Sequence, residues 1–158
     1  MKTLLAYATR HGCTEKCASL LKDAIGNEVT LMDLKKSQPK KLEKYDAFIL
    51  GGSIHIGKIQ GRIKKFYKKH NDILMRNKLG LFICCMEEGD TAQKEFNEAF
   101  PQDLIAHASA TGIFGGEFNF DKMNSIERKM IKNIAGVEKN ISKIKKRNII
   151  KFAKDFQQ

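Results

Sequence analysis

Runs of apolar residues alternate with amphipathic segments along the whole chain. The apolar runs predict five β-strands, at residues 2–8, 29–34, 47–52, 79–85 and 108–116. The third and fourth runs are continuous rather than alternating, as in strands that are buried on both faces of a parallel sheet. The sequence therefore favours a sheet whose central strands are covered by helices on both sides.

The segments between these runs carry apolar residues at helical spacing. They predict helices at residues 14–25, 63–74, 92–100, 125–134 and 149–156. Strands and helices thus alternate, which is the pattern of a doubly wound α/β fold. With right-handed crossovers, the common order of five parallel strands is 2-1-3-4-5. We therefore predict one α/β domain over residues 1–158, with a five-stranded parallel sheet in that order and helices on both faces.

A loop rich in hydroxyl groups follows the first predicted strand. It reads Thr9-Arg10-His11-Gly12-Cys13-Thr14 and leads into the first predicted helix. Doubly wound sheets bind ligands at the carboxyl ends of the strands where the strand order reverses, here between strands one and three. Backbone N–H groups at a helix N-terminus favour an anion, Thr9 and Thr14 can donate hydrogen bonds, and Gly12 admits close approach. The loop is a candidate phosphate site; the alternative is an ordinary helix cap formed by Thr14.

A second loop, Gly52-Ser53-Ile54-His55-Ile56-Gly57-Lys58, follows the third predicted strand. It satisfies the pattern G-x-x-x-x-G-K of P-loop nucleotide triphosphatases, which need Ser or Thr at the next position to hold Mg²⁺. Residue 59 is Ile, and the pattern normally follows the first strand of a sheet. The sequence therefore disfavours a nucleotide triphosphatase.

Together the two loops resemble those of the flavodoxin family. The first keeps Thr9, Gly12 and Thr14 of the flavodoxin pattern T-x-T-G-x-T, with His11 in place of the middle threonine. It is more similar to the loop S-T-R-D-G-x-T of the flavodoxin-like, menaquinone-dependent protoporphyrinogen oxidases of bacteria. The second loop is similar to A-S-I-R-Y-G-H of those enzymes. Residues 66–70 and 127–132 are similar to their segments F-V-K-K-H and D-R-F-M-I-K.

The resemblance implies FMN as the cofactor, with its phosphate in the first loop and its ring between the loops that follow strands three and four. The implied cofactor-binding residues are Thr9, Arg10, His11, Gly12, Cys13, Thr14, Ser53, Ile54, His55, Ile56, Gly57, Met86, Glu87, Glu88, Gly89 and Asp90. Neither ring loop contains Trp, Tyr or Phe, so the walls of the ring site are expected from Ile54, His55, Ile56 and Met86. Two residues are catalytic candidates: His55 for stacking on the flavin or donating a proton, and Lys58 for holding a substrate carboxylate.

The resemblance also implies an activity, the oxidation of protoporphyrinogen IX to protoporphyrin IX with electrons passing through FMN to a quinone. The chain departs from those enzymes in one respect. They carry a long insertion after the fourth strand, implicated in substrate and membrane contacts, whereas only a short predicted helix separates Met86 from the next strand here. The alternative function is that of a flavodoxin-like electron carrier without a substrate of its own.

The charge of the chain bears on its partners. Lys and Arg number 29 against 18 Asp and Glu, a net charge of +11, and basic residues concentrate in segments 58–78 and 135–158. Electron-carrying flavodoxins are typically acidic, so the basic character favours an anionic substrate such as a porphyrinogen, or an anionic membrane surface. A nucleic-acid partner is disfavoured, because it rests on charge alone without a recognition motif.

Cysteine spacing and hydropathy bear on the compartment. Cys13, Cys17, Cys84 and Cys85 form no Cys-x-x-Cys pair and have no histidine at zinc-finger spacing. We interpret them as reduced thiols and predict no metal site. The chain shows no signal-peptide pattern and no apolar run of about 20 residues. These features predict a cytoplasmic protein, and the basic charge leaves peripheral attachment to the inner face of the cell membrane as an alternative.

Overall fold

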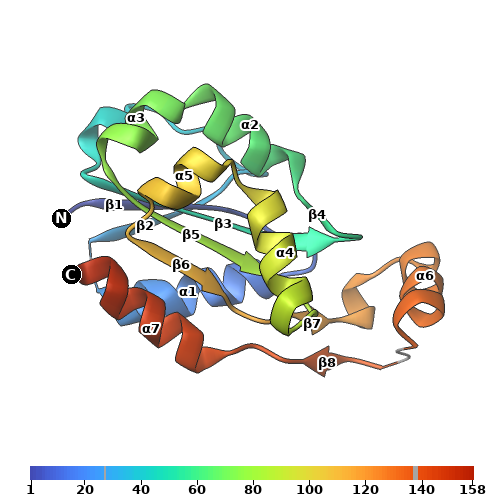
Figure 1. Cartoon of the computed structure of the whole chain (residues 1–158). Helices are drawn as coiled ribbons and strands as arrows, with labels where there is room; N and C mark the ends of the chain where they lie inside the picture. Colours follow the sequence, from blue (N-terminus) through green and yellow to red (C-terminus); the bar gives the residue numbers. More distant parts are fainter. Residues whose placement is uncertain (27, 137–138) are drawn as a thin grey trace.

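A computed structural model describes residues 1–26, 28–136 and 139–158. Its centre is a parallel sheet in the order β2-β1-β3-β5-β6 (Figure 1). The strands are β1 (Thr3–Ala8), β2 (Val29–Asp33), β3 (Ala47–His55), β5 (Lys78–Cys84) and β6 (Ala110–Ile113). These are the five predicted strands, and their order along the sheet is the predicted 2-1-3-4-5. The α/β fold class is confirmed.

Helices cover both faces of the sheet, as predicted (Figure 1). One face carries α1 (Cys13–Ile25) and α7 (Lys146–Gln157). The other carries α2 (Gly61–Lys69), α3 (Asn71–Arg76), α4 (Gly89–Ala99) and α5 (Gln102–His107). Each layer encloses its own apolar core: Leu5 and Phe82 belong to the core beneath α1 and α7, whereas Leu4 and Leu81 belong to the other. Neighbouring residues separate in this way because successive side chains of a strand point to opposite faces.

The end of β3 is a hairpin rather than the predicted loop. β3 continues beyond its predicted end at Gly52 to His55, and the chain returns through β4 (Lys58–Ile59), which pairs antiparallel with it. The two turn residues, Ile56 and Gly57, have φ of 49° and 71°. A two-residue turn with both φ values positive matches the twist of the flanking strands. The segment 53–58 is therefore held by strand pairing.

Several helix boundaries also differ from the prediction. The helix predicted at 63–74 is divided at His70 into α2 and α3, and α4 begins at Gly89 rather than at residue 92. The chain after Pro101 forms α5, which the sequence analysis did not predict, and the last parallel strand is correspondingly shorter. A short 3₁₀ helix, η1 (Leu42–Lys44), precedes β3.

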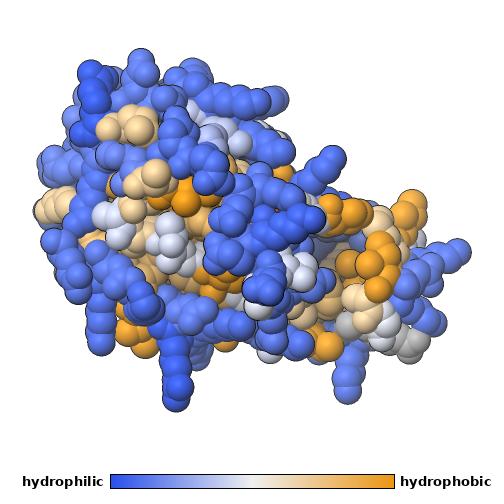
Figure 2. All heavy atoms as spheres, in the orientation of Figure 1, coloured by the Kyte–Doolittle hydropathy of each residue, from blue (hydrophilic) through white to orange (hydrophobic). Residues whose placement is uncertain are grey.

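An additional segment separates β6 from α7. It contains β7 (Glu117–Phe118), η2 (Phe120–Lys122), α6 (Ser125–Ala135) and β8 (Ile141–Ser142). β7 and β8 pair antiparallel, and α6 projects from the body of the molecule beyond them (Figure 1). α6 begins at Ser125 as predicted, with Asn124 and Glu127 forming a capping box. None of its residues is buried, and an apolar patch lies over it in Figure 2.

No helix in the described ranges combines the length and the apolar character that crossing a bilayer requires.

Candidate functional site

The loop after β1 was predicted to receive an anion, and its local structure has features that favour one. The backbone N–H of Gly12 donates to Thr9 Oγ1 at 2.9 Å, and Gly12 has a φ of +98° that favours glycine. The turn delivers the chain into α1, whose first residue is Cys13. Thr14 is fully buried, and among the described residues its Oγ1 has no hydrogen-bond partner. A buried hydroxyl without a partner at a helix N-terminus is explained by a ligand that accepts its hydrogen bond.

A lysine from the additional segment lies beside this loop. A Cβ atom placed on Gly12 would lie 2.8 Å from Lys122 Nζ. The ammonium group of η2 therefore faces the backbone of Gly12 and adds a positive charge to the helix N-terminus. Sequence reasoning missed Lys122, because it is 110 residues from the loop along the chain.

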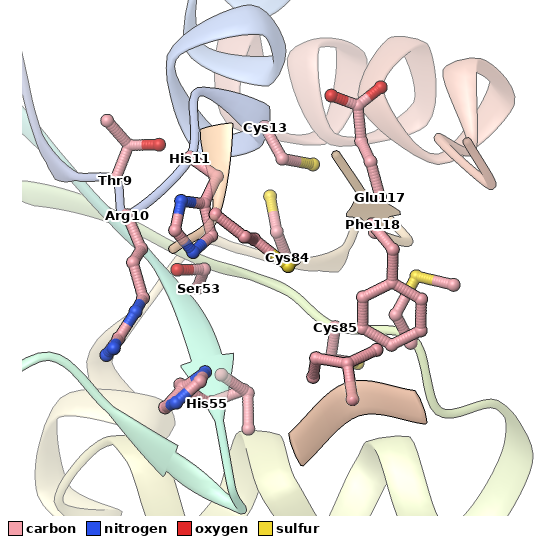
Figure 3. Close-up of a pocket in the computed structure, with 15 residues that line it drawn as sticks. Thr9, Arg10, His11, Cys13, Ser53, His55, Cys84, Cys85, Glu117 and Phe118 are labelled. Atoms are coloured by element: carbon pink, nitrogen blue, oxygen red, sulfur yellow. The ribbon is translucent and has the colours of Figure 1, made fainter. Parts of the chain in front are cut away.

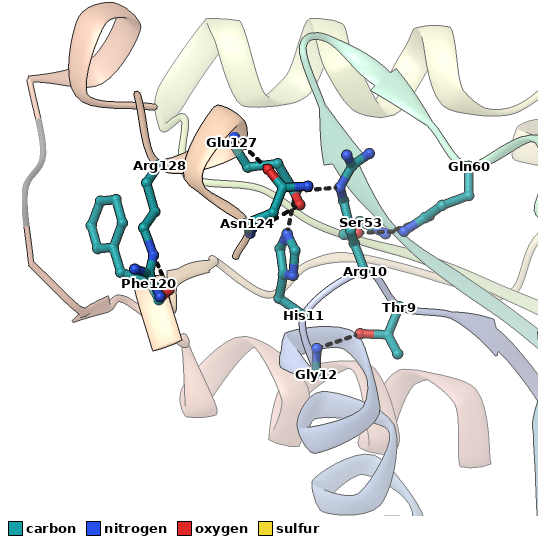
Figure 4. A network of polar contacts seen from close by, with 10 residues as sticks. All are labelled: Thr9, Arg10, His11, Gly12, Ser53, Gln60, Phe120, Asn124, Glu127 and Arg128. Atoms are coloured by element: carbon teal, nitrogen blue, oxygen red, sulfur yellow. Dashed lines mark hydrogen bonds and ion pairs between the residues drawn. The ribbon is translucent and has the colours of Figure 1, made fainter. Parts of the chain in front are cut away.

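Glu127 of α6 reaches back to the same loop. Its Oε2 accepts from Arg10 Nε at 2.9 Å and lies 2.8 Å from His11 Nε2 (Figure 4). Arg128 Nε donates to the carbonyl of Phe120 at 2.7 Å, which ties α6 to η2. Partial burial raises the pKa of Glu127, but hydrogen bonds from Arg10, the Asn124 backbone and His11 outweigh it and hold the pKa below its ordinary value. The carboxylate is thus already bonded to the Arg10 guanidinium and lies against the His11 ring in the predicted phosphate loop.

A cavity of 70 Å³ lies where the loop after β1, the ends of β3 and β5, and the additional segment meet (Figure 3). It is lined by Thr9, Arg10, His11, Cys13, Ser53, Ile54, His55, Cys84, Cys85, Met86, Gly116, Glu117, Phe118, Met123 and Ile131. All three parallel strands that border it contribute at their carboxyl ends, as expected at a switch point.

The end of β3 contributes the polar side chains Ser53 and His55. The backbone N–H of Ser53 donates to Gln60 Oε1 at 2.9 Å, and the Gln60 amide donates to the Ser53 hydroxyl, which fixes the start of the hairpin (Figure 4). Burial, together with the positive charge of Arg10, lowers the pKa of His55. His55 is therefore neutral at pH 7 and can both donate and accept a hydrogen bond.

Eight of the predicted cofactor-binding residues line this cavity: Thr9, Arg10, His11, Cys13, Ser53, Ile54, His55 and Met86. Gly12 lies in the turn that precedes α1, and Thr14 lies in the first turn of α1. The others, Ile56, Gly57, Glu87, Glu88, Gly89 and Asp90, are exposed outside the cavity. Lys58 is also exposed, on β4, and lines no part of it. As ligands of FMN all these residues stay predictions, as does the catalytic role of Lys58.

Sequence reasoning missed the walls that the additional segment supplies. Phe118 of β7 provides an aromatic face where Ile54, His55, Ile56 and Met86 were expected to form the site without one. Met123, which directly follows η2, and Ile131 of α6 also line the cavity. One signal was present: the pair Glu117-Phe118 directly follows the carboxyl end of the last predicted strand, the edge at which ligands bind.

The residues present fit the phosphate of FMN, because the orphaned Thr14 hydroxyl, the helix N-terminus and Lys122 all favour an anion. At the ring end, the cavity of 70 Å³ is lined by Phe118, Met123 and Ile131 of the additional segment as well as by the carboxyl ends of β3 and β5. The fit to FMN therefore rests on the phosphate end.

A second, basic cavity adjoins the first through Arg10, which lines both. It measures about 570 Å³ and lies against α2. Its lining residues are Arg10, Leu34, Gln38, Gln60, Gly61, Arg62, Lys65, Phe66, Lys69 and His70. Four of these are Lys or Arg, and none is Asp or Glu. The arrangement can bind a ligand with more than one carboxylate or phosphate group.

Comparison with known proteins agrees with this geometry. The profile of the flavodoxin domain family matches residues 4–145. A quinone-dependent protoporphyrinogen IX dehydrogenase of Escherichia coli K12 is 32% identical over 73 residues, which cover 44% of this chain and 40% of that protein. A flavodoxin of Nostoc sp. is 32% identical over 77 residues, covering 48% of this chain and 45% of that protein. Each match thus spans less than half the length of the curated relative.

Among solved structures, oxidised Flavodoxin 1 from Bacillus cereus superposes with a TM-score of 0.63. The match covers 99% of this chain and 97% of that one at 20% sequence identity. At this identity the likeness supports the fold alone.

Proposed function

We propose that this chain, which belongs to the flavodoxin domain family whose cofactor is FMN, is an FMN-dependent oxidoreductase. Its substrate would be a reduced, carboxylate-bearing molecule of the porphyrinogen type, and a quinone would accept the electrons. The partial identity to the E. coli dehydrogenase supports this choice. The observation that carries it is the basic cavity that adjoins the predicted ring site through Arg10. An electron carrier without a substrate has no need of such a cavity.

The chain's own residues divide into three tasks. Thr14, the N-terminus of α1 and Lys122 would hold the phosphate, and Phe118 and Met86 would cover the ring and exclude water. When bound, FMN supplies a two-electron acceptor that a quinone can regenerate. Neutral His55 faces the same cavity and would accept the proton that the substrate releases.

Substrate carboxylates would bind in the basic cavity, on Arg62 and Lys65 of α2. Both side chains are exposed to solvent, so each contributes about 0.2–1 kcal/mol to the binding of an anion. The two together account for about a tenfold change in binding. Because they lie away from the predicted ring site, they would act on substrate binding rather than on the chemical step.

The test is anaerobic oxidation of protoporphyrinogen by the FMN-loaded protein, followed by porphyrin fluorescence with a menaquinone analogue present. The double variant Arg62→Gln, Lys65→Gln should raise KM about tenfold and leave kcat within twofold. The control Lys94→Gln, Lys154→Gln makes the same change in net charge outside both cavities and should leave both constants unchanged.

A rate no higher than that of free FMN would refute the proposed substrate. If the reduced protein then still passed electrons to a redox protein, the alternative of an electron carrier would replace it. Equal effects of the two double variants would show that net charge, and not the cavity, attracts the substrate. Lys58→Ala in the same assay tests the predicted contact of Lys58 with a substrate carboxylate, and an unchanged KM would remove Lys58 from the substrate site.

A further inference from the structure

Three cysteines, two from α1 and one from the end of β5, converge beside the candidate site. The Sγ atoms of Cys13, Cys17 and Cys84 all lie within 4.8 Å of one another. Cys13 and Cys17 are one helical turn apart on α1 and share a face, and Cys84 ends β5. Cys17 and Cys84 are almost fully buried, whereas Cys13 is 9% exposed and lines the cavity (Figure 3).

The fourth cysteine shows how an isolated buried thiol behaves in this protein. Cys85 is next to Cys84 in sequence and is also buried, but it does not belong to the group. Its Sγ donates to the carbonyl of Glu87 at 3.6 Å, and burial, together with the negative charge of Glu95, raises its pKa to about 12. Cys85 is thus an ordinary protonated core cysteine.

The three grouped thiols behave differently from Cys85. Their sulfur atoms lie within reach of one another, whereas the sulfur of Cys85 bonds to a carbonyl. Cys13 is also the first residue of α1, where the helix dipole favours a negative charge. Lys16 adds a favourable positive charge, whereas Glu117, which pairs with Lys16 at 2.9 Å, opposes it. Three sulfur donors therefore meet at a single point, beside a helix N-terminus that favours negative charge.

This donor set matches what thiophilic metal ions require. Zn²⁺ bound tetrahedrally by thiolates at about 2.3 Å places the sulfur atoms about 3.8 Å apart. A limit of 4.8 Å between every pair of sulfur atoms leaves only about 1 Å of contraction for side-chain rotation to supply. Sites with three protein ligands keep a fourth position for water or substrate. The exposed edge of Cys13 gives the ion a route from the cavity.

We propose that Cys13, Cys17 and Cys84 form a binding site for a single Zn²⁺ ion, with its fourth position open toward the cavity. The three sulfur atoms bind as thiolates, so each thiol releases its proton as its sulfur–metal bond forms. The site carries one net negative charge when filled, which the N-terminus of α1 and Lys16 partly offset. The spacing rules of the sequence analysis missed it, because one ligand comes from a different element.

The proposal is tested on the reduced, metal-free protein under anaerobic conditions. Cd²⁺, which takes the same sulfur ligands, is titrated while the ultraviolet charge-transfer absorbance of cadmium–thiolate bonds is followed, and Zn²⁺ affinity is measured against a chromophoric chelator. We expect one ion per chain. Cys84→Ala and Cys17→Ala should weaken Zn²⁺ binding at least a hundredfold, whereas Cys85→Ala should leave stoichiometry and affinity unchanged. Circular dichroism checks that each variant is folded.

A second measurement needs no variant. Zn²⁺ should slow the alkylation of Cys13 by iodoacetamide in the wild-type chain, as followed by mass spectrometry of its peptides, and should leave the rate at Cys85 unchanged. Two results would overturn the proposal: no charge-transfer band at stoichiometric Cd²⁺, or an equal loss of binding in the Cys84→Ala and Cys85→Ala variants. Formation of a disulfide among the three cysteines under mild oxidation, in a reduced protein that binds neither metal, would assign the group to redox chemistry instead.

Discussion

Glu127 provides the sharpest test of the predicted phosphate loop. Its carboxylate accepts from Arg10 and lies against His11, so both side chains already have a partner before a ligand arrives. A phosphate that enters the loop must share these groups with Glu127 and lies close to a like charge. The variant Glu127→Gln removes the charge but keeps the shape, and Gln also serves in the capping box with Asn124. We therefore expect Glu127→Gln to bind FMN more tightly than the wild type.

The magnitude follows from the exposure of the pair. Arg10 and Glu127 are separated by 2.9 Å, and their side chains are 45% and 12% exposed. Because Arg10 is open to solvent, the pair contributes about 0.2–1 kcal/mol after solvent screening. Removing it, together with the repulsion between carboxylate and phosphate, should favour FMN by about 1 kcal/mol, which is about fivefold in Kd. The difference should shrink at high salt, because Arg10 is open to counterions.

The assay is a titration of FMN with the metal-free and flavin-free protein, followed by quenching of flavin fluorescence. Glu98→Gln is the matched control, since Glu98 pairs only loosely with Lys94 at 3.9 Å on exposed α4 and the change in net charge is the same. The pKa of Glu127 is lowered, so its pairing is present above the ordinary value of 4.5 and is lost as pH falls through the lowered pKa. The affinity ratio of variant to wild type should therefore approach one in acid. If Glu127→Gln bound FMN no better than Glu98→Gln at neutral pH, the carboxylate would not compete for the loop and the reasoning would fail.

Three further outcomes are expected. Thr14→Val should raise the free energy of unfolding of the flavin-free protein by about 1 kcal/mol, because it removes a buried hydroxyl without a partner. The same variant should weaken FMN binding about ten- to a hundredfold. Equal FMN affinities of variant and wild type in a titration would place the phosphate elsewhere. Ile56→Asn should raise Tm by about 3 °C in thermal unfolding, because a β-branched residue at φ 49° is strained whereas Asn suits this turn. An unchanged Tm would show that the turn is not strained. Vesicles with anionic lipid should bind the protein in a salt-sensitive way. Binding should weaken in the double variant Ile126→Ser, Ile134→Ser, because these two isoleucine side chains are 74% and 69% exposed on α6. Equal binding to neutral vesicles would contradict this contact.

The strands could be predicted because each depends on local sequence, and their order because it is the common one for a fold of this kind. The role of the loop after β1 as a phosphate site stays a prediction. Continuous apolar runs at 47–52 and 79–85 are compatible only with burial on both faces, and right-handed crossovers leave few orders for five such strands. The helix after Pro101 was missed because proline ends one helix but also suits the beginning of another. The hairpin at Ile56 was missed because isoleucine is one of the residues least suited to a positive φ, and only the pairing of β3 with β4 holds it there.

Tertiary structure decided everything that joins distant segments. Arg10 and Glu127 are 117 residues apart, and no periodicity indicates that α6 returns to the loop after β1. Phe118 lines the cavity, and Lys122 lies beside Gly12, because β7 and β8 pair and direct η2 toward the carboxyl edge of the sheet. The three thiols meet for the same reason: residues 13 and 17 share a helix face by local geometry, but only the packing of α1 on β5 brings residue 84 to them. Sequence spacing specifies which face of an element a residue occupies, whereas the packing of elements specifies what that face contacts.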